Sequence, residues 1–261
     1  MILKVSHVVL SSERFSENKL VLQQLGYTQI FTENNIINSP VKKPLFTHFN
    51  ERHDVGYFTA DKNVSIELLN WRTGNHCSSN FRFLFDALPP DSVRFKSTNT
   101  LSKEVWMEGD LNSFNLPISY LNTTEGTCQF NKVMIQTNHI PKSIDFWKYF
   151  RFMVISQSSS FALLELVPIV PRTKRFHLYL VRTENINTTP CLDNEGISCI
   201  SFLSNSIERE KELLYQKGLS TFDVGKLSIN NKILNILFVR GPAGELVEII
   251  DMKENDLRSA R

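Results

Sequence analysis

The chain has 261 residues, of which 41% are hydrophobic and 21% are charged, so it can bury a substantial core and needs no metal or disulfide merely to fold. Its formal net charge is +2, and the basic and acidic residues are spread along the whole length. This distribution offers no basic face for nucleic acid or for a membrane surface. We therefore expect a small molecule as the partner.

The beginning of the chain and its cysteines indicate the cellular compartment. The first apolar run, residues 5–10, is interrupted by His7 and followed by the polar residues 11–14, so we expect neither a secretion signal nor a membrane span. The cysteines lie far apart and form no CxxC pair, which favours reduced thiols in the cytoplasm over a disulfide framework or a zinc cluster. They are Cys77, Cys128, Cys191 and Cys199.

A fixed order of elements recurs along the chain, and this repeat is the main evidence for the fold. In the first copy, a strand at residues 4–10 and a polar capping stretch precede a helix that ends at Gly26. The helix is expected to turn Phe15, Leu22 and Leu25 inward. Three strands follow, at residues 28–31, 55–59 and 64–70.

The third copy begins with a strand at residues 131–136. Its helix begins at Pro141, a residue favoured at the first helical position because it lacks an amide donor. The helix is followed by strands at residues 151–156, 161–167 and 175–182.

The last copy begins with a strand at residues 196–203. Asn205 and Glu208 form a capping pair in front of a helix that ends at Gly218. Two glycines and a proline then predict a tight turn at residues 241–244. This turn joins the closing strands at residues 232–240 and 245–251.

Residues 80–122 are expected to hold a second, shortened module. No helix pattern occurs in it, and Pro89 and Pro90 predict a turn where the module helix would begin. Its strands are expected at residues 81–85, 102–108 and 116–121. A linker follows, so we predict an N-terminal domain at residues 1–124 and a C-terminal domain at residues 125–261.

Three segments resemble the vicinal oxygen chelate superfamily, which includes glyoxalases, bleomycin resistance proteins, epimerases and extradiol dioxygenases. Residues 241–250 (GPAGELVEII) are similar to the last hairpin of its modules, residues 6–10 (SHVVL) to the opening strand, and residues 65–69 (SIELL) to the fourth strand. The resemblance implies a glyoxalase-like α+β fold, in which βαβββ modules pair into curved, barrel-like mixed sheets.

The resemblance places His7 and Glu67 at metal-ligand positions, and Glu248 at the position of the glutamate in the last strand. The first and fourth strands of a module lie side by side in a curved sheet, so their imidazole and carboxylate can point into one cup. Such a pair suits a divalent cation that keeps open positions for substrate oxygens. Iron, zinc, manganese and nickel are the candidates.

The second module is expected to complete this site with its own first and fourth strands. Its candidates are Arg82 and Tyr120, and neither is a usual metal ligand. A site with only His7 and Glu67 would hold a metal weakly unless His48, His53 or His76 from the neighbouring loops completes it.

The C-terminal half is similar in layout to the catalytic half of extradiol dioxygenases, at residues 161–165 and 175–180. That family holds iron with two histidines and one glutamate, and the corresponding positions here are Lys132, Cys199 and Glu248. An ammonium does not bind a cation, and a cysteine changes the metal preference. We therefore do not expect an ordinary extradiol iron site in this half.

Each candidate residue also has a structural alternative. His7 could form hydrogen bonds inside the barrel, and Glu67 could face solvent. Glu248 could form a buried ion pair with Lys132 across the cup. Cys199 is expected to be a small core residue rather than a ligand or a nucleophile.

Two function classes follow from the sequence. The first is a metal-dependent lyase, isomerase or dioxygenase of the glyoxalase-like type that acts on a small oxygenated metabolite. The alternative is a metal-free protein that binds or sequesters a small ligand, and Lys132 and Cys199 in place of histidines favour it. His177 and Tyr179 could line a pocket or face solvent. A homodimer is compatible with either class.

Overall fold

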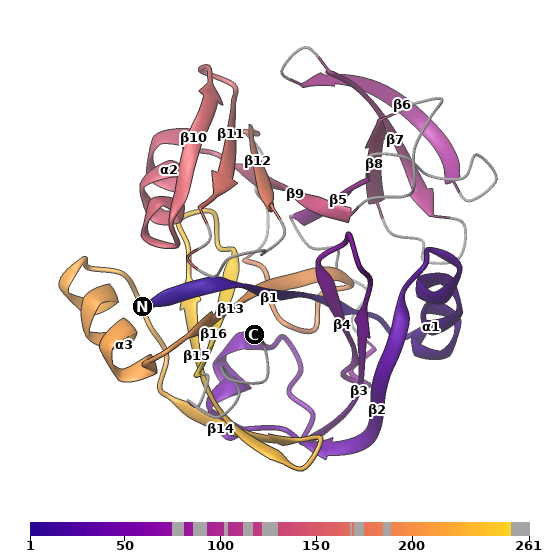
Figure 1. The fold of residues 1–261 in the computed structure, drawn as a ribbon, viewed down its shortest axis with the longest axis vertical. Coiled ribbons are helices and arrows are strands. Elements are labelled where there is room, and N and C mark those ends of the chain that lie inside the picture. The colour runs from indigo at the N-terminus through magenta and orange to yellow at the C-terminus, as the bar shows by residue number, and fades with distance from the viewer. Residues whose placement is uncertain are drawn as a thin grey trace.

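The computed structural model describes residues 1–74, 81–85, 93–101, 104–111, 117–121, 130–167, 169, 175–184 and 189–251, and it describes only the backbone of the strands between residues 82 and 121. In these ranges the chain forms two eight-stranded mixed sheets (Figure 1). Three α-helices and one 3-10 helix accompany the described strands. They are α1 (Phe15–Gln24), α2 (Ile140–Tyr149), α3 (Ile207–Gln216) and η1 (Pro40–Leu45).

The first sheet is built from both ends of the chain. Its strands are β1 (Ile2–Ser11), β2 (Thr28–Ile37), β3 (Arg52–Thr59), β4 (Ser65–Asn70), β13 (Gly196–Ser204), β14 (Gly225–Ile229), β15 (Lys232–Arg240) and β16 (Leu246–Asp251). The strand order is β14-β15-β16-β13-β1-β4-β3-β2. The central strands β1 and β13 are antiparallel, and each pairs in parallel with the last strand of its own module, β4 or β16.

The second sheet repeats this plan with the middle of the chain. Its strands are β5 (Phe81–Phe85), β6 (Val93–Leu101), β7 (Glu104–Leu111), β8 (Pro117–Leu121), β9 (Phe130–Thr137), β10 (Phe152–Gln157), β11 (Phe161–Leu166) and β12 (His177–Arg182). The strand order is β10-β11-β12-β9-β5-β8-β7-β6. Again the two central strands, β5 and β9, are antiparallel, and each pairs in parallel with the last strand of its module.

This topology corrects the expected pairing of modules. The first module pairs with the fourth, and the second pairs with the third, so each sheet takes one module from each side of residue 124. The sequence could not show this, because the order of modules along the chain does not determine which two share a sheet. The division into domains at residues 1–124 and 125–261 stays a prediction, and the expected linker lies outside the described residues.

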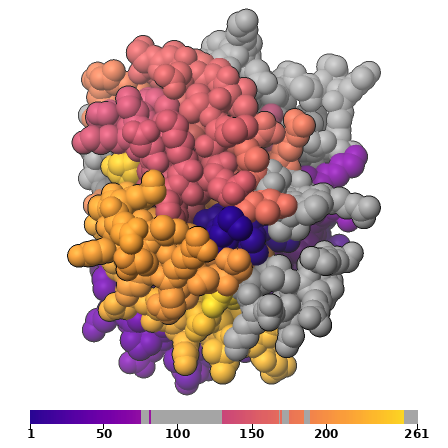
Figure 2. Space-filling view, turned by 60° about the vertical axis from the view of Figure 1, so that its left-hand side comes forward, coloured from indigo at the N-terminus to yellow at the C-terminus, as the bar shows by residue number. Residues whose placement is uncertain are grey.

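The two sheets share one hydrophobic core. Trp147 on α2 is fully buried and packs against Phe150 and Phe152 of its own module, and also approaches Phe202 on β13 of the first sheet. Phe150 stacks on Phe202, with ring centroids 5.0 Å apart. In the space-filling view, the third module sits directly on the fourth, and the indigo start of the chain lies between them (Figure 2). The burial of large aromatic surfaces thus joins the sheets.

The first sheet curls until its outermost strands, β14 and β2, approach each other (Figure 1). The β14–β15 turn is Asn230-Asn231, and both residues have positive φ, as a two-residue hairpin turn requires. The backbone N–H of Asn230 donates to Glu33 Oε2 on β2, at 2.8 Å. The connection between β2 and β3, residues 38–51, folds back with η1 and packs against β14. The result is a nearly closed cup.

Most local predictions are confirmed. Gly26 and Gly218 have positive φ directly after α1 and α3, as expected of glycines that end helices. Two strands were missed, β6 and β14, since both are rich in polar residues. The N-cap of α3 is Ser206, whose hydroxyl accepts from the N–H of Arg209, instead of Asn205.

Two further predictions concern a turn and a membrane span. The expected turn at Pro89 and Pro90 lies outside the described residues. In the part of the chain that the structure describes, no helix has the length and apolar character that crossing a membrane requires.

Candidate functional site

Three candidate ligands converge on the inner face of the first sheet. His7 lies on β1, Glu67 on β4 and Glu248 on β16. His7 pairs with Ser201 across the β1–β13 ladder, and Ser201 pairs with Glu248, so these three positions form one row across adjacent strands. Side chains in such a row point to the same face of a sheet. Glu67 lies on the strand at the other side of β1.

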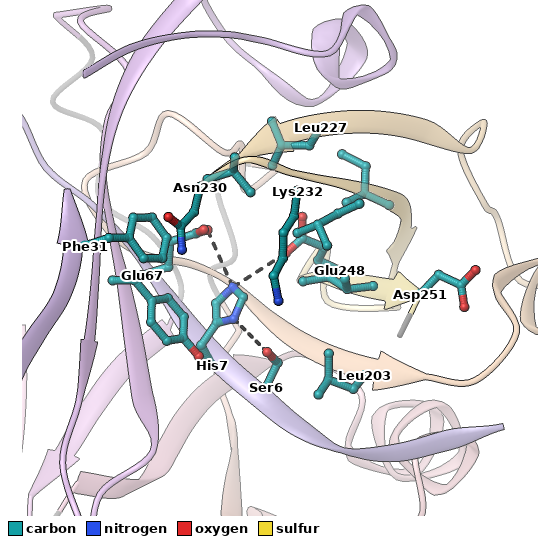
Figure 3. A pocket seen from close by; sticks show the side chains of 15 residues that line it. Ser6, His7, Phe31, Glu67, Leu203, Leu227, Asn230, Lys232, Glu248 and Asp251 are labelled. Carbon is teal, nitrogen blue, oxygen red and sulfur yellow. Dashed lines mark hydrogen bonds and ion pairs between the residues drawn. The ribbon is translucent and has the colours of Figure 1, made fainter. Parts of the chain in front are cut away.

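The three side chains are close enough to share one ion. His7 Nε2 is 3.5 Å from Glu67 Oε2 and 3.7 Å from Glu248 Oε2 (Figure 3). One potential ligand atom from each residue lies within 4.8 Å of the other two. On the other edge of the imidazole, Nδ1 is hydrogen-bonded to Ser6 Oγ at 2.9 Å, which fixes the ring.

Burial and charge shift the pKa values of this group in different directions. Burial alone would lower the pKa of His7, but the carboxylates of Glu67 and, more weakly, Glu248 outweigh it and raise that pKa. Burial opposes ionisation of Glu67 as well, yet His7 holds the pKa of this carboxyl below its usual range. For Glu248 burial dominates, and its pKa is raised. The two carboxylates are therefore not equivalent.

The donor set fits a divalent cation. Nε2 of His7 is buried and has no hydrogen-bond partner among the described residues, because the distances to both carboxylates are too long for good hydrogen bonds. Donor atoms about 2.0–2.2 Å from one central metal lie roughly 3–4 Å from each other, and His7 Nε2 has this spacing from both carboxylates. One imidazole and two carboxylates suit zinc, manganese, iron or nickel.

The group forms the floor of a cavity of about 320 Å³. Phe31 and Tyr57 stack on one side with their ring centroids 5.7 Å apart, and the rings of His7 and Tyr57 are nearly perpendicular, with centroids 5.5 Å apart. The opposite wall is aliphatic and comes from the β13–β16 part of the sheet (Figure 3). Its residues are Leu203, Leu227, Ile229, Leu234, Ile236 and Ile250. A small molecule with an apolar part fits such walls.

Polar side chains stand around the mouth of the cavity. Asn230 and Lys232 come from the β14–β15 hairpin, and Asp251 comes from the end of β16. Lys232 extends from the hairpin over the cavity (Figure 3). The hairpin thus supplies both apolar and charged contacts to a ligand.

A residue that sequence reasoning missed lies beneath the floor. Lys42 on η1 is buried, and its ammonium lies over the ring of Trp71 at 5.2 Å and over that of Phe238 at 5.7 Å from the centroid. Its charge acts on His7, Glu67 and Glu248. The sequence contains no signal for it, because a lysine followed by Lys43 and Pro44 is typical of an exposed loop.

Two other predicted residues lie near the group without joining it. His53 on β3 is buried against Trp71, with ring centroids 4.7 Å apart, and burial together with Lys42 lowers its pKa to about 3. Cys199 on β13 is buried, and burial together with Glu248 raises the pKa of its thiol. It packs among apolar side chains, as expected of a core cysteine.

The arrangement decides between alternatives that the sequence left open. Glu248 contacts His7, whereas Lys132, its alternative partner, lies on β9 in the other sheet. Among the described residues the third member of the group is Glu248, one of the three candidate ligands, and His53 lies outside the group. One expectation is corrected, since the site was expected between the first two modules and the group lies between the first and the fourth.

The remaining candidates belong to the second sheet. Lys132 on β9 and His177 on β12 are cross-strand neighbours, and His177 lies 3.8 Å from Glu165 Oε1. Tyr179 is buried against Met134. The side chains of Arg82 and Tyr120 lie outside the described residues, as does His76.

Comparison with known proteins supports the fold. No family model and no curated protein matches the sequence. Among solved structures, glyoxalase I from Zea mays superposes with a TM-score of 0.65 at 11% identity, over 98% of this chain and 94% of that chain. A dioxygenase-like protein from Bacillus subtilis, described as a putative dioxygenase, superposes with a TM-score of 0.63 at 12% identity, over 96% of this chain and 85% of that chain. These likenesses confirm the glyoxalase-like α+β fold.

Proposed function

We propose that the protein is a metal-dependent enzyme of the glyoxalase, epimerase or dioxygenase type, and that His7, Glu67 and Glu248 hold one divalent cation. The observation that carries this proposal is the convergence of these three residues within 4.8 Å at the floor of a cavity. Three protein ligands leave coordination positions for substrate, as in catalytic rather than structural sites. Iron, zinc, manganese and nickel are the candidate metals.

A bound cation would supply Lewis-acid polarisation of neighbouring substrate oxygens, which supports lyase, isomerase or oxygenase chemistry. Ser6 holds the imidazole of His7 through Nδ1, so that Nε2 faces the carboxylates. Glu67 and Glu248 both line the cavity beside His7, so each carboxylate is a candidate to accept a substrate proton.

The walls indicate the size and character of the substrate. The aliphatic wall and the stacked pair of Phe31 and Tyr57 accommodate an apolar or aromatic part, while its oxygens face the floor. We infer a small oxygenated metabolite with such a part. A homodimer and a cytoplasmic location stay predictions, and free Cys191 and Cys199 are compatible with the latter.

One observation favours the metal-free alternative. With its raised pKa, His7 can carry a proton between two carboxylates, which gives the group a consistent charge without any metal. The cup would then bind or sequester a small ligand through its walls alone.

The two functions can be separated with protein purified without chelator. We expect bound metal by elemental mass spectrometry, or uptake on titration with Zn²⁺, Mn²⁺, Ni²⁺ or Fe²⁺, and its loss in His7→Ala. The control is His177→Ala, which removes a histidine from the second sheet and is expected to leave metal uptake unchanged. No bound metal and no uptake by the wild type would contradict the enzyme. An organic ligand seen by native mass spectrometry, bound equally well by His7→Ala, would support the alternative.

A further inference from the structure

Lys42 places a positive charge at the base of the cup. Its side chain is 3% exposed, and its ammonium lies over the ring of Phe238, which is the cross-strand neighbour of Glu248. It also lies over Trp71, the residue that follows β4, where Glu67 is located. Among the described residues, no carboxylate oxygen lies within 4.0 Å of the Lys42 ammonium. The charge is therefore close to the group without being neutralised by a direct ion pair.

The segment that carries Lys42 is an addition to the repeated module. The connection between β2 and β3 spans residues 38–51, whereas the corresponding connections of the third and fourth modules span only residues 158–160 and 230–231. The addition fills the base of the first cup. Its Lys42 therefore has no counterpart in those two modules.

Several contacts fix this segment in place. The N–H of Leu192 donates to the carbonyl of Leu45, and the N–H groups of Thr47 and His48 donate to the Asp193 carboxylate. A Cβ added at Gly225 would lie 2.2 Å from Val41, so β14 admits the segment only because this position is glycine. The position of Lys42 is thus part of the fold and is not that of a mobile surface lysine.

The charges at the base can be counted from their surroundings. His53 is neutral because its pKa is lowered to about 3, and Cys199 is neutral because its pKa is raised. At the mouth, Lys232 and Asp251 carry opposite charges. If a divalent cation is held by neutral His7 and the two glutamates, the two carboxylate charges cancel that of the cation. Lys42 then leaves one positive charge in excess.

We propose that Lys42 is a fixed positive charge that weakens the hold of His7, Glu67 and Glu248 on a divalent cation and selects a singly anionic chelating ligand. This inference rests on the proposed metal site. A second cation near the metal opposes metal binding, and the opposition is strong in a buried site because screening there is weak. An anionic oxygen ligand removes the excess charge, so metal and anion bind together better than either binds alone.

The first experiment measures metal affinity by titration calorimetry with MnCl₂. In Lys42→Met, which keeps the apolar stem and removes the charge, we expect the affinity for Mn²⁺ to rise on the order of ten-fold. The matched control is Lys43→Met, which removes the same charge from the exposed neighbour on η1 and is expected to leave the affinity near that of the wild type. Thermal unfolding checks that both variants fold, and Lys42→Gln replaces Lys42→Met if it does not.

The second experiment measures ligand binding to the Mn²⁺-loaded proteins. Glycolate is the singly anionic probe, and hydroxyacetone is a neutral probe with the same pair of neighbouring oxygens. We expect Lys42→Met to bind glycolate roughly ten-fold more weakly than the wild type does and to bind hydroxyacetone equally well.

The outcomes separate this inference from the proposed function. If the wild type binds Mn²⁺ and Lys42→Met binds it no more tightly, or if both proteins bind glycolate equally, the inference is wrong and the metal site stands. If neither protein takes up Mn²⁺, both fail. If only Lys42→Met takes up the metal, Lys42 has the proposed effect and the natural protein works without metal.

Discussion

The two sheets have the same strand order by module, and their inner faces differ. In the first sheet, the inner strands present His7, Glu67 and Glu248 to a cavity, and the sheet curls until β14 meets β2. In the part of the second sheet whose side chains are described, Met134 and Tyr179 pack together with apolar neighbours, and the outer strands β6 and β10 lie apart (Figure 1). The repeated module thus supplies the backbone fold, and the side chains at a few inner positions decide whether a sheet forms a candidate metal site.

The second difference is the length of one connection. Residues 38–51 fill the base of the first cup and carry Lys42, whereas the turn at residues 158–160 is too short to reach into the second cup. A closed base excludes water from one side of the site and strengthens its electrostatic interactions. His7 and Glu248 are accordingly buried and the side chain of Glu67 is 13% exposed, while His177 and Glu165 in the second sheet are 21% and 22% exposed.

The largest expected effect tests whether the two sheets are one folding unit. Trp147→Ala removes the fully buried ring between them, so we expect a loss of about 3–5 kcal/mol in the free energy of unfolding. Urea denaturation measures it, and Tyr215→Ala, at an exposed position on α3, is the control with little effect. Because the core is shared, both sheets should unfold in one transition. A first sheet that stays folded while the second unfolds would contradict the shared core.

The next largest expected effect is on the affinity for Mn²⁺, and it compares the inner faces of the two sheets directly. Glu67→Gln keeps the shape of the side chain and removes a proposed ligand, so we expect the affinity for Mn²⁺ to fall on the order of 100-fold. Glu165→Gln makes the same change beside His177 in the second sheet and is expected to leave the affinity unchanged. Calorimetric titration measures both. Equal losses in the two variants would show that the difference between the sheets has been misread.

The third effect is a pH dependence of stability, which distinguishes the structural carboxylate of Glu245 from the carboxylates of the site. Burial raises the pKa of Glu245, in the turn between β15 and β16, to about 7. Its ionisation therefore destabilises the fold, beginning as the pH rises above about 4.5 and reaching its full extent above about 7. The free energy of unfolding of Glu245→Gln, relative to that of the wild type, should therefore be higher at about pH 8 than at about pH 5. The increase should be up to about 3 kcal/mol.

Urea denaturation at the two pH values measures the effect, and Mn²⁺ affinity serves as the control. Glu245 is not part of the proposed metal group, so Glu245→Gln should bind Mn²⁺ as the wild type does. A stability difference that is the same at both pH values would rule out titration of Glu245 as its cause.

The sequence predicted the modules because their signals are local. Pro141 at the start of α2 and Gly26 and Gly218 after α1 and α3 punctuate the helices, and these positions are confirmed. The resemblance of residues 6–10 and 65–69 placed His7 and Glu67 on neighbouring strands, where the structure has them.

The rest depended on contacts between distant segments. Glu248 was identified as a candidate, but its meeting with His7 depends on β13 lying between β1 and β16, and nothing local determines this. Lys42 was missed for the same reason, since its burial depends on Trp71, Phe238 and the glycine at 225. Local patterns predict elements, whereas the composition of a site built from three strands and a 3-10 helix needs the tertiary fold.

The smallest effect tests the closure that distinguishes the first sheet. Glu33→Ala removes the carboxylate that accepts from the N–H of Asn230, an exposed contact worth about 0.5–1 kcal/mol. We expect faster hydrogen exchange at the tip of the β14–β15 hairpin and faster loss of Mn²⁺ to a chelator, because this hairpin lines the cavity. Glu212→Ala, which removes an exposed contact with Gln216 on α3, is the control and should change neither rate. If the tip exchanges equally in Glu33→Ala and in the wild type, the carboxylate does not hold the cup closed, and the curl of the sheet alone brings β14 to β2.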